Sequence, residues 1–131
     1  MINGIKRGKA AEHIFAAKAL LYGYEVFMPL NDDGRIDTIV NGHRVQIKVV
    51  SKGDSYKTSG YIKLIKSGKR STGEVKKYSY TKEDVDFIAG IDTDTFDFYI
   101  LPIAYVANYA STVGISRIVL DGYINNMSIL A

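Results

Sequence analysis

The sequence of 131 residues contains no cysteine and only two histidines. Without cysteine the chain has no disulfide framework, no thiolate ligand for a metal ion and no thiol nucleophile. The first residues lack the apolar core of a signal peptide, and no window is long and apolar enough to span a membrane. We therefore expect a cytoplasmic protein that works without a membrane.

The composition is that of an ordinary globular chain. Hydrophobic residues make up 47% of the sequence and charged residues 24%, which indicates neither a disordered nor a fibrous protein. The length is sufficient for one domain with a hydrophobic core and short for two. We therefore expect residues 1–131 to form a single domain.

Positive charge is concentrated in the middle of the chain. The stretch from Arg44 to Lys82 has eleven Lys or Arg and two acidic residues, whereas the rest of the chain has six and twelve. The formal net charge of +3 thus divides into about +9 for the middle and about −6 for the remainder. Such a block is the electrostatic footprint expected of a phosphate-binding surface, with a solvated lysine-rich loop as the alternative.

Apolar spacing predicts the order of the secondary structure. Hydrophobic residues three to four apart indicate a helix over residues 5–22, which Gly23 ends. The lysine-, glycine- and serine-rich segment 51–77 has too few apolar residues for much core and is predicted to be a basic excursion. Other predicted elements are strands at residues 24–28, 86–91, 96–101 and 115–120 and a helix at residues 102–109.

The clearest local signal is the sequence RIDTIV-NG-HRVQIKVV at residues 35–50. Two alternating runs joined by Asn41 and Gly42 predict a tight two-residue hairpin. In that register Asp37 lies opposite Gln46. Because side chains alternate across a strand, two sets of residues are expected on opposite faces: Ile36, Thr38, Val40, Val45, Ile47 and Val49 toward the core, and Asp37, Gln46 and Lys48 away from it.

The second set has the chemistry of phosphodiester hydrolysis. Carboxylate, amide and backbone carbonyl oxygens suit Mg²⁺, and a nearby lysine can orient the attacking water or offset charge in the transition state. Asp37 is notable because aspartate is depleted inside strands. The alternative is that Gln46 and Lys48 are only the wet side of a half-buried strand.

A helix glutamate, a strand aspartate and then Q-x-K on the next strand resemble the PD-(D/E)xK nuclease superfamily, in the branch where glutamine replaces the second acid. The likeness is closest to the small PD-(D/E)xK endonucleases that include the cyanobacterial group I intron homing endonuclease. It starts at RGKAAEHIFAAKALLYGYEVFMPL, continues through RIDTIV and VQIKVVSK and resumes at YTKEDVDFIAGIDTDTFDFYILPI. Together these segments span most of residues 7–103.

The resemblance implies an α/β fold with a restriction-endonuclease-like core, in which helices flank a mixed β-sheet; segment 51–77 would add a basic β-ribbon or loop. It also implies the catalytic residues Glu12, Asp37, Gln46 and Lys48. Mg²⁺, with Mn²⁺ as a substitute, would be held by Asp37, Glu12, Gln46 and the backbone carbonyl of Ile47. Glu12 enters through the resemblance, since no local pattern places its helix against the hairpin.

Two departures from the family pattern matter. Ile36 stands where a proline or an aromatic residue often precedes the aspartate. Gln46 leaves the site with one negative charge fewer to hold a metal, which would favour a site that recruits metal mainly when a DNA phosphate contributes an oxygen.

Three functions remain open on the sequence: a site-specific endonuclease of homing or mobile-element type, a structure-selective nuclease such as a Holliday junction resolvase, and a nucleic-acid-binding module without turnover. Lys48 argues against the third, and the long basic excursion favours the first. The expected contacts to double-stranded DNA are Arg7, Lys9, Arg44, Lys52, Lys57, Lys63, Lys66, Lys69, Arg70, Lys76 and Lys77.

Cutting both strands of a duplex requires two active sites, and a chain of this size offers one. We therefore expect a homodimer or a homotetramer. The apolar stretches 115–120 and 124–130 are the expected contact surface.

Overall fold

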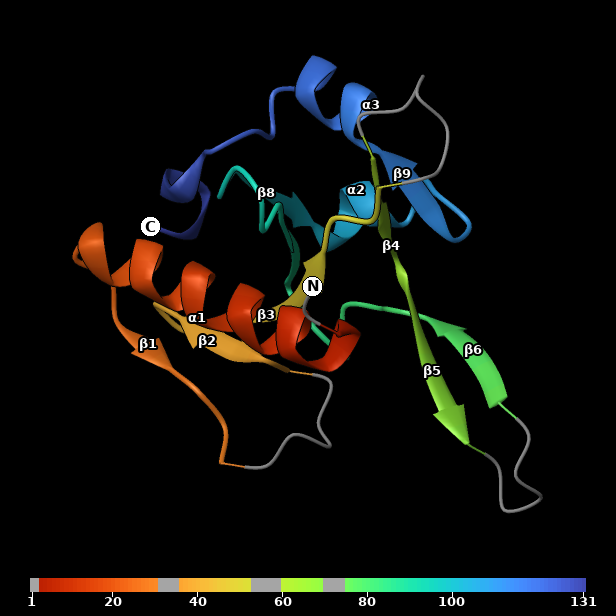
Figure 1. The fold of residues 1–131 in the computed structure, drawn as a ribbon, viewed down its shortest axis with the longest axis horizontal. Helices are drawn as coiled ribbons and strands as arrows, with labels where there is room; N and C mark the ends of the chain where they lie inside the picture. Colours follow the sequence, from red (N-terminus) through yellow and green to blue (C-terminus); the bar gives the residue numbers. More distant parts are fainter. Residues whose placement is uncertain (1–2, 31–35, 53–59, 70–74) are drawn as a thin grey trace.

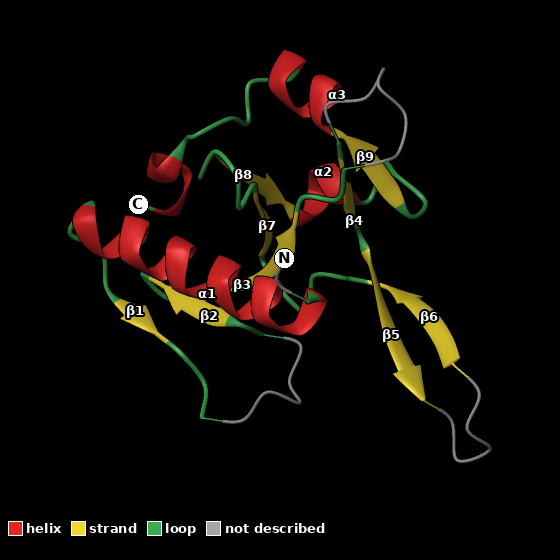
Figure 2. Ribbon diagram, in the orientation of Figure 1, coloured by secondary structure: helices red, strands yellow, loops and turns green. Residues whose placement is uncertain are grey.

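The computed structural model describes residues 3–30, 36–52, 60–69 and 75–131, with only the backbone for residues 66–69 and 75–78. The centre of the fold is a five-stranded sheet in the order β1-β2-β3-β7-β8, in which β3 and β7 are parallel and the other neighbours antiparallel. Figure 1 labels β1, β2, β3 and β8 of this sheet, and Figure 2 also labels β7. Their bounds are α1 (Gly4–Leu21), β1 (Val26–Phe27), β2 (Thr38–Val40), β3 (His43–Val49), β4 (Tyr61–Lys63), β5 (Ile65–Lys69), β6 (Val75–Ser79), β7 (Phe87–Ile91), β8 (Phe98–Pro102), α2 (Ile103–Val106), β9 (Thr112–Gly114), α3 (Ile115–Leu120) and the 3₁₀ helix Met127–Leu130.

Helix α1 begins and ends close to the predicted bounds. The side chain of Asn3 caps it by accepting a hydrogen bond from the Lys6 N–H at 2.9 Å. Gly23, with φ of +84°, then takes the left-handed conformation that follows many helices. The helix buries Ala11, Phe15 and Ala19 completely. These side chains pack on the sheet in a core cluster with Val45 and Ile47 of β3.

A second core cluster fills the other face of the sheet. It joins Ile88 of β7 and Leu101 of β8 to Ile62 of β4, Val113 of β9 and Ile118 of α3. The strands β5 and β6 pair with each other outside the central sheet and form a two-stranded ribbon. Figure 2 shows this ribbon extending away from the rest of the fold. The predicted mixed sheet flanked by helices is confirmed. The ribbon of the predicted excursion 51–77 lies at residues 65–69 and 75–79, and the expectation that this segment adds little core is wrong, because Ile62 and Leu64 are buried in the second core cluster.

The predicted hairpin is present in its expected register near the turn. Asn41 and Gly42 have φ of 49° and 83°, and Thr38 pairs with Val45 on the neighbouring strand. The expected register does not continue to residue 37. The Asp37 N–H donates to the Val45 carbonyl at 3.0 Å, so two residues of this segment oppose one on β3, as in a β-bulge.

This bulge corrects the predicted position of Ile36. Its side chain packs against the second core cluster, not with Val45 and Ile47 beneath α1. The alternation rule fails here because it assumes an unbroken ladder, and the extra residue reverses the order of the faces.

Two predictions for the last third of the chain are wrong. Residues 115–120 form a helix, α3, instead of a strand: Ile115 and Ile118, three residues apart, are buried, whereas Val119 and Leu120 are exposed. Their β-branched composition favours a strand, but packing in the second core cluster overrides it. Helix α2 is also shorter than expected and covers only Ile103–Val106.

The C-terminal apolar stretches are largely used within the chain itself. Ile118, Met127 and Leu130 are buried almost completely, and they belong to the two core clusters. The exposed apolar side chains there are Leu120 and, to smaller degrees, Val119 and Ile124. Most of the expected oligomer contact surface is therefore core. Among the described residues, no helix is both long and apolar enough to cross a membrane.

Gly90 permits the second core cluster to approach the sheet. A Cβ at this position would overlap Ile62, which is fully buried. We expect Gly90→Ala to lower the free energy of unfolding by about 1–3 kcal/mol, the usual cost of overpacking. The control is Gly8→Ala in α1, where no atom of the described residues lies within 4 Å of the added Cβ. Denaturant unfolding compares the two, and wild-type stability of Gly90→Ala would contradict this packing.

Candidate active site

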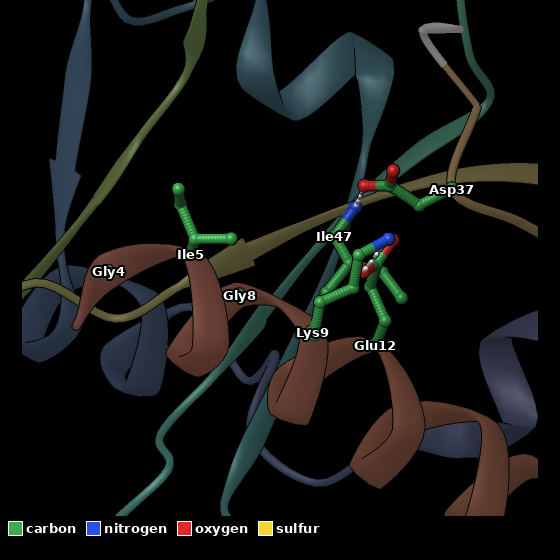
Figure 3. Close-up of a pocket in the computed structure, with 7 residues that line it drawn as sticks. All are labelled: Gly4, Ile5, Gly8, Lys9, Glu12, Asp37 and Ile47. Carbon is green, nitrogen blue, oxygen red and sulfur yellow. Dashed lines mark hydrogen bonds and ion pairs between the residues drawn. The ribbon is translucent and has the colours of Figure 1, made fainter. Parts of the chain in front are cut away.

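A cavity of about 360 Å³ lies between the first half of α1 and the hairpin. Gly4, Gly8 and Glu12 are four residues apart and line it from one face of the helix. A Cβ added at either glycine would meet no atom of the described chain within 4 Å, so this part of the helix surface is open. Figure 3 shows the lining residues, which also include Ile5, Lys9, Asp37 and Ile47.

Asp37 is anchored where the pairing of β2 with β3 ends. Its Oδ2 accepts a hydrogen bond from the Ile47 N–H at 2.9 Å. Because Thr38 pairs with Val45, the next hydrogen-bonding position of the antiparallel ladder falls at Ile47. The segment before β2 has bulged, and the carboxylate takes the place of a backbone carbonyl there. The strand end thus fixes the orientation of Asp37.

The environment of Asp37 disfavours its charged form. Burial raises the pKa of Asp37 to about 6, and the Glu12 carboxylate adds to this, while the Ile47 N–H and Lys48 act in the opposite direction. Two acids that share a partly buried site repel each other when both are ionised. A divalent cation would relieve this repulsion.

Glu12 reaches this site from α1. Its side chain is 17% exposed, and its Oε2 lies 3.7 Å from the Lys9 ammonium. Sequence reasoning had no local signal for this placement, because it depends on how α1 packs across β3. The packing of Ala11 and Phe15 on Val45 and Ile47 sets the helix against the hairpin.

Gln46 lies on β3 and is not one of the residues that line the cavity. Its Oε1 is the buried side-chain atom left without a hydrogen-bond partner within the described part of the chain. Burying an unsatisfied carbonyl oxygen costs about 1–3 kcal/mol. Such an oxygen is a suitable ligand for a hard cation.

Lys48 is on the same face of β3 as Gln46, away from α1. Its Nζ donates to the carbonyl of Ile65 at 3.2 Å and lies 5.1 Å from the centroid of the Tyr80 ring. Burial lowers the pKa of Lys48, Asp37 opposes this effect, and Lys63 adds to it. The lysine is therefore held at the base of the ribbon, within electrostatic reach of Asp37.

The four predicted catalytic residues are thus divided by β3. Glu12 and Asp37 meet in the cavity beneath α1, and Gln46 and Lys48 project from the other face of the strand. Asp37 connects the two sides, since both Glu12 and Lys48 act on its ionisation. The expectation that Asp37 simply shares a strand face with Gln46 and Lys48 is wrong, because the bulge at Asp37 interrupts the alternation.

The donor set fits a hard divalent cation. The described residues contain no cluster of three or more His, Cys, Asp or Glu side chains placed for a metal. The oxygen ligands that the site offers are the carboxylates of Asp37 and Glu12 and the unpartnered Gln46 oxygen, with the backbone of Ile47 next to Gln46 on β3. Mg²⁺ can bind to a site with so few protein ligands because it prefers oxygen ligands and keeps several waters.

Several of the expected DNA contacts are engaged within the chain. Arg44 places its Nη2 3.0 Å from Asp86 Oδ1 and donates to the carbonyls of Lys82 and Glu83. Lys52 lies 2.9 Å from a carboxylate oxygen of Asp92. The partners of both are about 40 residues further along the sequence, so local charge counting could not find them.

The remaining expected contacts fall into two groups. Arg7 is half-buried on α1, Lys9 is exposed on the same helix near Glu12, and Lys63 is exposed on β4. Lys57, Arg70 and the side chains of Lys66, Lys69, Lys76 and Lys77 lie outside the described residues.

The fold has a relative of known structure. It is similar to the bacterial homing endonuclease I-Ssp6803I with a TM-score of 0.75 and 19% identity, covering 87% of this chain and 78% of that one. At this identity the likeness is one of fold. No curated protein matches the chain in sequence.

A family model gives the assignment that the fold alone does not. The model described as PD-(D/E)XK endonuclease matches residues 2–119. This match confirms the resemblance drawn from the helix glutamate, the strand aspartate and the Q-x-K sequence. Because it covers nearly the whole of the 131 residues, the chain belongs to the PD-(D/E)XK endonuclease family.

Proposed function

We propose that residues 1–131 form one nuclease domain that hydrolyses phosphodiester bonds of double-stranded DNA with the help of a divalent metal ion, Mg²⁺ or in its place Mn²⁺. The observation that carries this proposal is the pairing of Asp37 and Glu12 in one cavity, where burial raises the pKa of Asp37 to about 6. A divalent cation bound by both carboxylates would offset their mutual repulsion.

Each residue of the site has a role in this proposal. Asp37 and Glu12 hold the metal, with the Gln46 amide oxygen and the Ile47 carbonyl as neutral ligands. When bound, the metal supplies Lewis acidity and makes water a better nucleophile. The Ile47 N–H keeps Asp37 in one orientation. Lys48 orients the attacking water or offsets the negative charge that develops on the phosphate.

The ribbon supports a site-specific mode of action. Its strands pair regularly from Ile65↔Ser79 to Lys69↔Val75, and the major groove of DNA admits a two-stranded ribbon of this kind. The solved structure that this fold resembles is that of a homing endonuclease. We therefore favour recognition of a DNA sequence by the basic segment 51–77 over recognition of a junction.

Cleavage of both strands implies assembly. Because each chain offers one site, a homodimer or homotetramer would place two sites on one duplex. Since most apolar residues of the C-terminal stretches are core, the contact must use another surface or only the exposed Leu120, Val119 and Ile124. Sedimentation at working concentration measures this, and a monomer would contradict double-strand cleavage by this chain alone.

The test of the function uses three substrates, supercoiled plasmid, a synthetic four-way junction and single-stranded DNA, each with Mg²⁺, with Mn²⁺ or with EDTA. We expect cutting of duplex DNA that depends on the metal and yields fragments of defined length. Preferential cutting of the junction would replace site specificity with structure selectivity. Binding of every substrate without cutting any of them would refute the nuclease proposal.

A further inference from the structure

The described contacts of the Lys48 ammonium both come from the base of the ribbon. Ile65, whose carbonyl accepts its hydrogen bond, is the first residue of β5. Tyr80, whose ring lies 5.1 Å away, directly follows β6. Ile65 pairs with Ser79, so the two contacts are adjacent points of the same structure.

The ribbon base is fixed in the second core cluster. Leu64 and Tyr80, which flank the first ribbon pair, are 2% and 7% exposed. The Leu64 N–H also donates to the carbonyl of Ser111 at 2.7 Å, which ties the base to the segment before β9. A ring held in this way has little freedom, and it can therefore define the position of a side chain that rests on it.

Lys48 differs in its partners from other cationic side chains of the fold. Arg44 and Lys52 are bonded to the carboxylates of Asp86 and Asp92. Lys48 instead contacts a carbonyl and an aromatic face, which are neutral groups that attract a cation without cancelling its charge. Lysine has a flexible four-carbon stem, so these contacts immobilise the ammonium and leave its charge for a phosphate.

We propose that Tyr80 is a positioning residue for Lys48: its ring, with the Ile65 carbonyl, holds the ammonium at the base of the ribbon in the place from which it acts on the substrate. This assignment rests on the proposed function of Lys48. It gives the ribbon base a role in the chemical step, separate from any contact that the ribbon makes with DNA.

The kinetic test compares three variants with the wild type. Tyr80→Leu removes the ring but keeps an apolar side chain, Tyr80→Phe keeps the ring, and Val113→Ala perturbs the same core cluster from β9. We expect Tyr80→Leu to lower kcat about 10- to 100-fold, because small misplacements of a catalytic group have effects of this size. The Kd for DNA should change less than about threefold, since phosphate contacts dominate it.

Tyr80→Phe should retain kcat within about threefold, because the face of the ring makes the contact. Equal losses in Tyr80→Phe and Tyr80→Leu would overturn the role of the ring. A loss of kcat in Val113→Ala as large as that in Tyr80→Leu would reduce the effect to general destabilisation. A change of Kd without a change of kcat would also overturn the proposal.

A second measurement does not require cleavage. The rate at which an acylating reagent labels Lys48, followed by peptide mass spectrometry, should rise about threefold or more in Tyr80→Leu, because the ring shields the amine. The exposed Lys6 serves as the internal reference. Unchanged labelling of Lys48 overturns the positioning role. If the wild type cuts no DNA, the proposed function fails, and the labelling still decides whether Tyr80 holds Lys48.

Discussion

Replacing Lys48 with methionine is expected to lower kcat by about 10³-fold, which is the effect of removing a preorganised charge that stabilises a transition state. Methionine keeps most of the apolar stem and removes the ammonium that lies over the Tyr80 ring. Burial lowers the pKa of Lys48, but Asp37 favours its charged form. The loss should therefore appear in the chemical step more than in folding.

The control is Lys82→Met, which removes one positive charge from an exposed side chain two residues after Tyr80. Both variants should bind DNA within about threefold of the wild type, because affinity is the sum of many phosphate contacts. Single-turnover cleavage with saturating protein separates the two effects. Equal rates for the wild type and Lys48→Met would remove Lys48 from the mechanism.

The sequence predicts those parts of the site that depend on local geometry. Asn41 and Gly42 favour positive φ, so the turn and the pairing of Val40 with His43 and of Thr38 with Val45 follow from the sequence. The position of Asp37 does not follow. The bulge there is stabilised by Ile36, which packs in a cluster built from distant strands, and by the Ile47 N–H.

Long-range contacts account for the other differences. Glu12 reaches Asp37 only because α1 crosses β3. The apolar pattern of residues 5–22 predicts that this helix packs on the core, but it does not predict the orientation of the helix on β3. Arg44 carries the charge of a DNA contact, but the fold brings Asp86 to it. In α3, burial of Ile115 and Ile118 decides against the strand that their β-branched side chains favour. The resemblance to the nuclease family predicted Glu12, because the motifs of a family reflect the tertiary packing that its members share.

Asp37→Asn is expected to have opposite effects on stability and activity. Burial raises the pKa of Asp37 from its ordinary value of 3.8 to about 6. The folded protein therefore holds this proton more tightly than the unfolded chain does, and the associated stability is present below pH 3.8 and lost as the pH rises through about 6. Above that pH the ionised carboxylate destabilises the metal-free fold.

Asparagine removes the charge and keeps an oxygen that can accept from the Ile47 N–H. At pH 7.5 in EDTA, Asp37→Asn should raise the free energy of unfolding by about 1–2 kcal/mol, a value reduced from the full linkage energy because Asp37 is partly exposed. Near pH 4 the two proteins should differ little. Glu25→Gln, which removes a negative charge from an exposed position, is the control.

The metal should reverse this order of stability. Mg²⁺ stabilises the state that binds it, so it should raise the Tm of the wild type at pH 7.5 and have little effect on Asp37→Asn. Cleavage by Asp37→Asn should fall by about 10³-fold, because its site lacks the carboxylate that holds the ion. A variant that is less stable than the wild type in EDTA would show that the Asp37 carboxylate stabilises the fold. A variant that is more stable and inactive would show that the carboxylate destabilises the metal-free fold and is needed for cleavage.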